Sequence, residues 1–321
     1  MEYKFTVSSS PHIHQKETIS SIMLDVIIAL IPAAICGIYS FGYRAAMVML
    51  TTMAACVLSE YAYQKLMKKS VTASDCSALL TGLLLGLNLP PSIPFWMAAV
   101  GGFFAIIVVK QLYGGLGKNF LNPALAARCF MLIAWPQAMT TFTEPNAAAS
   151  AVSSATPLAI LKGTGTGALP SVFEAFFGHT AGCIGEVSAA MLLIGFIYLL
   201  IRKVISPRIP LTYVLTFAVL MLLFGNNQSG ESTLTFTLLH ILNGGLLLGA
   251  IFMATDYVTT PTTPLGQIIF ACGCGLLTFV IRRFGGYPEG TSFAILLMNL
   301  TVPLIDGAIL PKRFGEVKKN A

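Results

Sequence analysis

Hydroxyl and carboxyl side chains gather at two places in this chain of 321 residues. The first is SAVSSATPLAI at positions 150–160, where serines and a threonine precede a proline. The second is TDYVTTPTTP at positions 255–264, where Asp256 lies among threonines and prolines. Hydroxyls donate and accept hydrogen bonds, and carboxylates accept them and bind hard cations. These two stretches are therefore the first candidates for a binding site.

Each stretch also has a purely structural interpretation. A run of Ser and Ala is typical of a flexible loop without chemical consequence. In the second stretch, Asp and Thr side chains can satisfy the local backbone of a stiff connector. Alternatively, the same side chains form a rim of hydrogen-bonding oxygens that faces a bound group or a cation. The residues alone leave these alternatives open.

A third polar stretch, GKNFLNP, occupies positions 117–123. In it Asn122 directly precedes Pro123, which is the arrangement of an N-cap followed by the first residue of a helix. Helix capping is therefore a sufficient structural account of this motif.

The seven cysteines do not predict a metal site, because they are scattered along the chain. Cys272 and Cys274 are the one close pair, and two residues apart on a helix their side chains point to nearly opposite sides. No zinc, haem or iron–sulfur spacing is present in the sequence.

The composition is that of an integral membrane protein. Hydrophobic residues make up 55% of the chain and charged residues only 10%, whereas a soluble domain carries about 25% charged residues. The apolar runs approach the ~20 residues that a spanning helix needs. The net charge of +6 lies in short segments between these runs, so it indicates topology and not a nucleic-acid partner.

Ten apolar segments are expected to be membrane-spanning helices, which makes the fold all-α. Their approximate ranges are 20–39, 44–62, 76–89, 94–112, 122–136, 186–202, 210–224, 238–254, 264–282 and 291–308. The third and fifth are short, and short or proline-interrupted segments commonly mark functional sites in helical transporters.

The distribution of Lys and Arg predicts that both termini are cytoplasmic. With the amino end inside, fourteen basic residues lie on the cytoplasmic side and four on the outer side. The inner set is Lys4, Lys16, Lys65, Lys68, Lys69, Lys110, Lys118, Arg202, Lys203, Arg208, Lys312, Arg313, Lys318 and Lys319. The outer set is Arg44, Lys162, Arg282 and Arg283. The segment 137–185 is then an extracytoplasmic loop.

Two stretches of the second half repeat the first half. LTGLLLGL at 80–87 is similar to NGGLLLGA at 243–250, and VVKQLYGG at 108–115 to VIRRFGG at 280–286. Five spans per half would invert the second copy in the membrane. The predicted organisation is a cytoplasmic segment 1–19, a first five-helix repeat 20–136, the loop 137–185, a second repeat 186–308 and a cytoplasmic tail 309–321.

Acidic residues in or near the spans are functional candidates, because a charge in hydrocarbon costs several kcal/mol. Asp25 lies early in the first predicted span, and Asp306 lies near the cytoplasmic end of the tenth. Both can be interfacial residues, and so can Glu60. Alternatively, Asp25 and Asp306 line a route for Na⁺ or H⁺.

Three stretches together resemble the RnfD/NqrB family of membrane flavoprotein subunits. They are GGLGKNFLNPALAARCFML at 114–132, SSATPLA at 153–159 and MATDYVTTPTTPLGQ at 253–267. Members of this family are subunits of the Rnf ferredoxin:NAD oxidoreductase and of the sodium-pumping NADH:quinone oxidoreductase. The resemblance extends from about residue 15 to 312, and the length and short amino end are similar to the RnfD branch of the family.

The resemblance implies that FMN is joined through its phosphate to Thr156, which follows Ser153, Ser154 and Ala155. A separate flavin transferase, acting outside the cytoplasmic membrane, would form the phosphoester. Ser154 stands where Gly is commoner in the family, and Ser150 stands where the transferase motif usually has Asp.

The resemblance also implies a second, noncovalent flavin, riboflavin, near the GKNFLNP stretch. Lys118, Asn119 and Asn122 are the candidates for hydrogen bonds to an isoalloxazine edge. Separately from this resemblance, Asp256, Thr259 and Thr260 are the candidates for the rim that the TDYVTTPTTP stretch would present to a flavin or a cation.

Three functions are compatible with the composition: an electron-carrying flavoprotein of an ion-pumping complex, a secondary transporter built from inverted repeats, and a structural subunit. The resemblance favours the first. The chain has neither a nicotinamide-binding fold nor cluster ligands, so it is expected to act only as one subunit. Its expected partners are Rnf subunits of the A, B, C, E and G types and membrane lipid, and its expected location is the cytoplasmic membrane of the cell.

Overall fold

The computed structural model describes residues 18–143, 153–178, 180–227, 230 and 232–309. The predicted cytoplasmic segments 1–19 and 309–321 and the serine at position 150 therefore fall almost wholly outside the described residues. The described part is predominantly helical, in agreement with the all-α prediction.

The first half contains five main helical segments, counting α4 and its continuation as one. The elements are α1 (Ile19–Phe41), α2 (Tyr43–Leu66), η1 (Ala73–Asp75), α3 (Ser77–Leu87), α4 (Phe95–Phe103), η2 (Phe104–Gln111) and α5 (Pro123–Ala134). Element η2 continues α4 as a π-helix. The Asn122 side chain caps α5 and Pro123 is its first residue, as the sequence predicts.

The predicted loop 137–185 has more regular structure than its composition suggested. It contains α6 (Pro136–Thr140), β1 (Phe142–Thr143), β2 (Ser153–Ser154), α7 (Pro157–Leu161), α8 (Val172–Phe177) and η3 (Ile184–Glu186). The strands β1 and β2 pair antiparallel, with Phe142 opposite Ser154. Local caps explain the short helices, because the hydroxyls of Thr156 and Ser171 cap α7 and α8.

The second half contains α9 (Ala189–Ile201), α10 (Arg208–Phe224), α11 (Thr233–Leu242), α12 (Leu246–Leu248), η4 (Gly249–Met253), α13 (Pro264–Phe284) and α14 (Thr291–Ala308). The predicted span 238–254 is wrong as a single helix. It is broken between α11 and α12, where the chain bends by 59°. Gly244 lies in the break with φ +75°, a conformation that glycine adopts at little cost.

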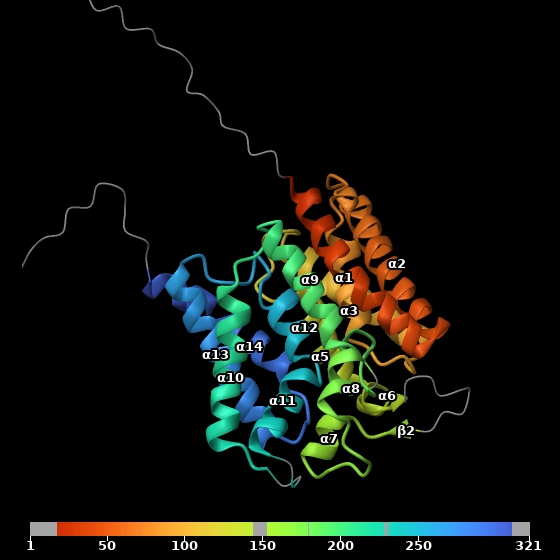
Figure 1. Cartoon of the computed structure of the whole chain (residues 1–321). Coiled ribbons are helices and arrows are strands. Elements are labelled where there is room, and N and C mark those ends of the chain that lie inside the picture. The colour runs from red at the N-terminus through yellow and green to blue at the C-terminus, as the bar shows by residue number, and fades with distance from the viewer. Residues whose placement is uncertain (1–17, 144–152, 179, 228–229, 231, 310–321) are drawn as a thin grey trace, which may run out of the picture.

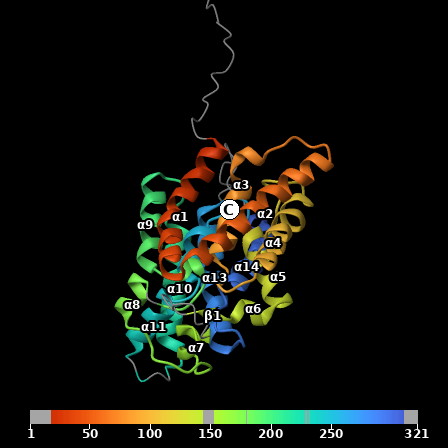
Figure 2. The same cartoon turned by 90° about the vertical axis from the view of Figure 1, so that its right-hand side faces the viewer.

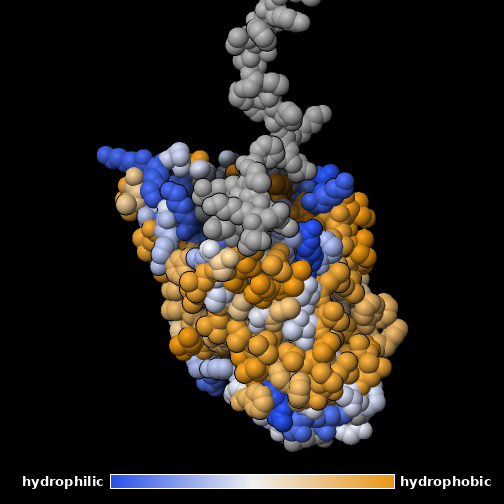
Figure 3. Space-filling view, turned by 90° about the vertical axis from the view of Figure 1, so that its left-hand side faces the viewer, coloured by the Kyte–Doolittle hydropathy of each residue, from blue (hydrophilic) through white to orange (hydrophobic). Residues whose placement is uncertain are grey.

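Four helices are long and apolar enough to cross a membrane by themselves: α1, α2, α13 and α14. The bent pair formed by α11 and α12–η4 is a fifth candidate. Shorter apolar helices occupy the other predicted ranges, at 77–87, 95–111, 123–134, 189–201 and 208–224. Figure 3 shows a broad hydrophobic belt between more hydrophilic ends, as expected of a multi-pass membrane protein.

The helices run roughly side by side, and α6, α7 and α8 gather at the end opposite the start of α1 (Figures 1 and 2). Within the halves, α2 packs on α3 and α4, and α13 packs on α10 and α14. The contact between α1 and α9 joins the two halves. Pairing across the halves places residues distant in sequence around common cavities.

Three basic residues that we counted as loop charges are not free surface charges. Lys110 is 2% exposed and Arg282 is 3% exposed, and Arg202 pairs with Asp25. Lys110 lies 2.9 Å from the carboxylate of Glu60, which is itself fully buried. Each of the three has an acceptor inside the protein, so they are a poorer guide to topology than the counting assumed.

Candidate functional site

Two pockets border helix α5, one at its start and the other from its middle onward. Pocket 1 is lined by its first residues, Pro123 and Ala124, and pocket 2 by Arg128, Cys129 and Leu132. A helix rises 1.5 Å per residue, so Ala124 and Arg128 are about 6 Å apart along the axis. Each pocket draws residues from both halves of the chain.

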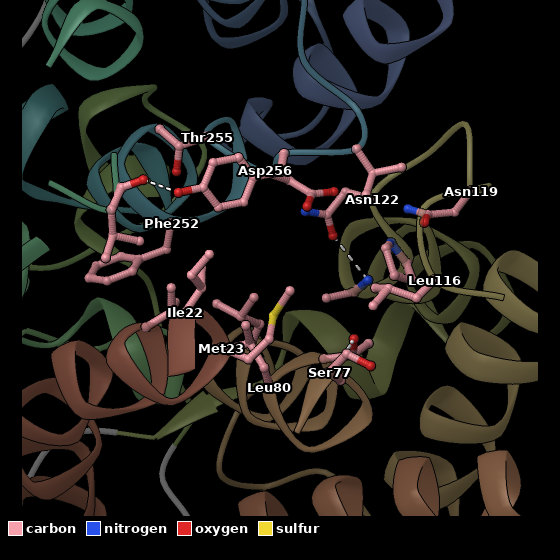
Figure 4. A pocket seen from close by; sticks show the side chains of 18 of the residues that line it. Ile22, Met23, Ser77, Leu80, Leu116, Asn119, Asn122, Phe252, Thr255 and Asp256 are labelled. Carbon is pink, nitrogen blue, oxygen red and sulfur yellow. Dashed lines mark hydrogen bonds between the residues drawn. The ribbon is translucent and has the colours of Figure 1, made fainter. Parts of the chain in front are cut away.

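Pocket 1 is a hollow of about 780 Å³, including the part open to the outside. Figure 4 shows Asn119, Asn122 and Asp256 on one side of the cavity, and Ile22 and Leu80 from α1 and α3 across it. The structure thus brings together three of the side chains that the sequence proposed. Lys118 is exposed and does not line the pocket.

Asn122 is fully engaged in holding the pocket together. Its Oδ1 accepts hydrogen bonds from the backbone N–H groups of Ala124 (3.1 Å) and Leu125 (3.3 Å), which caps α5. Its Nδ2 donates to the carbonyl oxygen of Met253 at 3.2 Å. Asn122 therefore joins α5 of the first half to η4 of the second, and the capping interpretation is confirmed.

Asp256 lines pocket 1 and is fixed by two threonines. The Thr259 hydroxyl donates to Asp256 Oδ2 at 3.0 Å, and the Thr260 hydroxyl donates to the Asp256 carbonyl oxygen at 2.7 Å. Burial raises the pKa of Asp256 above its usual range, although the bond from Thr259 partly offsets this. Thr259 and Thr260 do not line the pocket, so their role is to support Asp256 and its turn.

At one edge of pocket 1, Tyr257 connects the turn after η4 to the segment that follows α9. The Tyr257 hydroxyl donates to the carbonyl oxygen of Val204, and both residues line the pocket. At another edge, the ammonium of Lys110 donates to the Ser77 hydroxyl at 2.6 Å.

Pocket 2 is a hollow of about 720 Å³, including its open part. Its lining includes Thr156 and the aromatic residues Phe142, Tyr287 and Phe293. Arg128, Glu186 and Glu289 line it as well. The pocket therefore combines an apolar wall, several hydroxyls that include Thr156, and a group of charges.

Thr156 stands at the start of α7, immediately before Pro157. Its Oγ1 accepts a hydrogen bond from the backbone N–H of Ala159 at 3.3 Å, and the residue is half-buried. Ala155 precedes it, and Ser153 and Ser154 form the short strand β2. The hydroxyl is thus held at the pocket wall by a cap.

Lys162 fixes the other end of α7. Its ammonium donates to the carbonyl oxygens of Gly285 and, at 2.9 Å, Tyr287. Desolvation lowers the pKa of Lys162 below its usual range. This contact joins the segment that carries Thr156 to the segment between α13 and α14.

The charges of pocket 2 form a buried cluster. Arg128 donates to both carboxylate oxygens of Glu289 and to the Ser292 hydroxyl at 2.6 Å. Its Nη2 also lies 3.7 Å from Glu186 Oε1. Burial raises the pKa of Glu289, but the facing Arg128 outweighs it, so this pKa lies below its usual range.

The two acidic residues proposed for an ion path have structural partners. Asp25 accepts from the Arg202 guanidinium at 3.0 to 3.3 Å and from the Tyr198 hydroxyl at 2.9 Å. Asp306 accepts from the backbone N–H of Thr262 at 3.1 Å. Asp25 thereby joins α1 to α9, and Asp306 fixes the TTPTTP turn against α14. Both carboxylates therefore have a structural role, and their proposed place on an ion path stays a prediction.

The sequence reasoning did not identify Glu186 or Glu289, and it assigned no site role to Arg128. Glu289 lies 161 positions from Arg128. One signal was present: an arginine within the fifth predicted span requires a partner, since an unpaired charge in hydrocarbon is costly. The identity of that partner needed the fold.

The chain matches the model of the NQR2, RnfD, RnfE family over residues 6–315. It belongs to this family. It is 48% identical to the D-type subunit of the Na⁺-translocating ferredoxin:NAD⁺ oxidoreductase complex of Acetobacterium woodii, covering 100% of this chain and 99% of that protein. It is 45% identical to the proton-translocating counterpart of Clostridium ljungdahlii, covering 97% of this chain and 96% of the relative.

A more distant relative is also covered along its whole length. The D-type subunit of the ion-translocating oxidoreductase complex of Escherichia coli K12 is 38% identical, over 98% of this chain and 99% of that protein. The recognition made from the three sequence motifs is confirmed by these family matches.

Proposed function

We propose that this family member carries FMN as a phosphoester on Thr156, with the flavin ring in pocket 2. The observation that carries the proposal is the position of the Thr156 hydroxyl at the wall of an aromatic-lined hollow. The SSAT motif leads directly into this hydroxyl. Bound there, the flavin would supply one-electron redox chemistry between one-electron and two-electron carriers.

The residues of pocket 2 fit such a group. A hollow of about 720 Å³ is within the range of ligand pockets, which are mostly apolar with a few placed polar groups. Phe142, Tyr287 and Phe293 can cover the ring, and Thr156 offers the oxygen that a phosphoester requires. Lys162 would keep α7 against the opposite wall, so that the attachment residue stays at the pocket.

Pocket 1 is the proposed site of a noncovalent flavin such as riboflavin. It has amide and carboxyl groups on one side, from Asn119 and Asp256, and apolar side chains on the other. Asn122 would serve as a structural support, because both ends of its amide are already engaged. The exposed Lys118 is left out of this proposal, because it does not line the pocket.

The protein is a subunit of an ion-translocating ferredoxin:NAD⁺ oxidoreductase, as are the relatives that it covers end to end. Its partners are the other subunits of such a complex. We infer that the shorter apolar helices also cross the membrane, giving ten spans in two inverted repeats. Pocket 2 would then face outward, on the side opposite the two termini, and pocket 1 would face the cytoplasm.

Flavin fluorescence on a denaturing gel tests the attachment residue. The chain is produced together with the flavin transferase, as wild type and as Thr156→Ala. A fluorescent wild-type band and a dark Thr156→Ala band are expected, because denaturation removes every flavin that is not covalently bound. Thr164→Ala is the matched control, since Thr164 is an exposed hydroxyl in the same segment.

Two results would contradict the proposal. A dark wild-type band would favour a secondary transporter without a redox cofactor. A band that stays fluorescent in Thr156→Ala would place the attachment on another residue, and Ser153→Ala and Ser154→Ala would then identify it.

A further inference from the structure

The buried cluster of pocket 2 has one positive and two potentially negative groups. Side-chain exposure is 10% for Arg128, 6% for Glu186 and 20% for Glu289. A buried carboxylate without an adequate partner is strongly disfavoured. The bonding of the two glutamates therefore decides which of them carries the negative charge.

Glu289 is bonded as an ionised carboxylate. Both of its oxygens accept from Arg128, and Oε1 also accepts from the backbone N–H of Gly245 at 2.7 Å. Ser292 takes another N–H of the guanidinium. Arg128 and Glu289 thus form a neutral pair with well-satisfied hydrogen bonds.

Glu186 is bonded much less well. Its Oε2 accepts one long bond, 3.5 Å, from the backbone N–H of Cys183. Its Oε1 is buried and has no hydrogen-bond partner among the described residues. This oxygen lies beside Gly245, where an added Cβ would collide with one oxygen of Glu186 and one of Glu289. Glu186 therefore faces a carboxylate that already pairs with the nearest cation.

We propose that Glu186 holds a proton at neutral pH and is the proton-exchanging group of pocket 2. Glu186 would pass this proton to the occupant of the pocket when that occupant gains an electron. It would regain the proton when the electron leaves. One proton moves for one electron, and the electron comes from and returns to a one-electron carrier in a partner subunit. This role rests on the proposed function of pocket 2.

The groups that face Glu186 from the surrounding elements act in both directions, because Glu289 favours its protonated form and the Arg128 cation opposes it. They are Arg128 on α5, Glu289 before α14, Cys183 on its own loop, and Arg282 on α13, which bonds the carbonyl oxygen of His240 on α11. Glu186 lies in η3, before the first residue of α9. Burial, together with the charge of Glu289, raises the pKa of Glu186 to about 8. The carboxyl is then protonated below this pH and ionised above it.

Infrared difference spectroscopy of the purified complex in lipid nanodiscs tests the proton directly. Spectra recorded on either side of pH 8 should show a carboxylic-acid C=O band that disappears at the higher pH. Ordinary carboxyls are already ionised across this range, because their pKa values lie near 4. The band should be absent in Glu186→Gln and retained in Glu174→Gln, a matched control at an exposed capping glutamate.

Glu289→Gln is an independent test that keeps Glu186 in place. Without Glu289, Glu186 becomes the carboxylate partner of Arg128, so its proton should leave and the band should be lost already below pH 8. Absence of the band from the wild type, or its persistence in Glu186→Gln, would overturn the proposal.

The flavin is not needed for these infrared measurements, so failure of the proposed function can be recognised separately. Thr156→Ala should keep the band although it lacks covalent flavin. In flavin-loaded complex, the midpoint potential should change less steeply with pH around 8 in Glu186→Gln than in the wild type. Equal slopes would show that the proton of Glu186 is not exchanged with pocket 2.

Discussion

Pockets 1 and 2 use the same helix in different ways. At the start of α5, Asn122 satisfies backbone groups of α5 and η4, so pocket 1 is assembled by neutral amide and hydroxyl contacts. Further along α5, Arg128 pairs with Glu289 of the second half and lies 3.7 Å from Glu186 of η3, so pocket 2 is assembled around buried charge. Both arrangements join the two halves of the chain. Only that of pocket 2 depends on which of its carboxyl groups is protonated. Pocket 1 is thus suited to hold a ring by hydrogen bonds, and pocket 2 to respond to charge.

The largest difference between the pockets should appear when the buried cation is removed. Arg128→Met leaves Glu289 without its partner, and breaking a buried ion pair costs about 3–5 kcal/mol. A large drop in the thermal melting temperature of the complex in nanodiscs is expected. Adding Glu289→Gln should recover part of the loss, since it removes the orphaned charge. If the melting temperature of Arg128→Met equals that of the wild type, pocket 2 is not organised by charge.

Substitution of Asn122, which joins α5 to η4 at pocket 1, should lower the melting temperature less than Arg128→Met. Asn122→Ala removes a helix cap worth about 1 kcal/mol and a hydrogen bond worth about 1 kcal/mol. Asn122→Ser keeps a neutral capping oxygen but is too short to bond the Met253 carbonyl, so it should cost less. The two variants are compared by thermal melting. Equal losses would mean that the cap contributes nothing.

Removing the Tyr257 hydroxyl at the edge of pocket 1 should change the rate at which noncovalent flavin dissociates more than the thermal stability of the protein. Tyr257→Phe removes a hydrogen bond worth about 1 kcal/mol, which corresponds to somewhat less than a tenfold change in rate. Noncovalent flavin should dissociate several-fold faster, as measured by stopped-flow fluorescence after dilution. Tyr287→Phe is the control in pocket 2 and should leave this rate unchanged. A similar acceleration in both variants would remove the distinction between the pockets.

The smallest effect is expected for an ion pair outside both pockets. The Asp25 side chain is 11% exposed, but that of Arg202 is 53% exposed and the Tyr198 hydroxyl also bonds Asp25, so solvent screening should bring this pair towards about 0–1 kcal/mol, the value typical of surface pairs. Arg202→Met should therefore lower the melting temperature far less than Arg128→Met. A loss as large as that of Arg128→Met would show that burial does not distinguish the two arginines.

Local patterns made much of the fold predictable. The Asn122–Pro123 pair gave the start of α5, and the apolar runs gave the positions of helices such as α1 and α14. The break between α11 and α12 was missed because the apolar run continues through it. Its bend depends on one glycine with positive φ, and hydropathy does not register backbone conformation.

Candidate site residues could be predicted where one stretch of chain carries them. Motif reasoning proposed Asn119, Asn122 and Asp256 from two separate stretches, and the fold brings them to the lining of one pocket. Glu186 and Glu289 could not be assigned, because their importance comes from meeting Arg128 across the two halves. The exposure of Lys118 was equally hidden, since Asn119 directly after it is buried while Lys118 itself is exposed.

The central claim is that Thr156 is the point of covalent attachment. Tandem mass spectrometry of the peptide spanning positions 153–162, taken from complex isolated from its native membrane, tests it most directly. The account predicts fragment ions that carry the mass of FMN, less one water, on Thr156. An unmodified Thr156 in such material, or the added mass on a neighbouring serine, would contradict it.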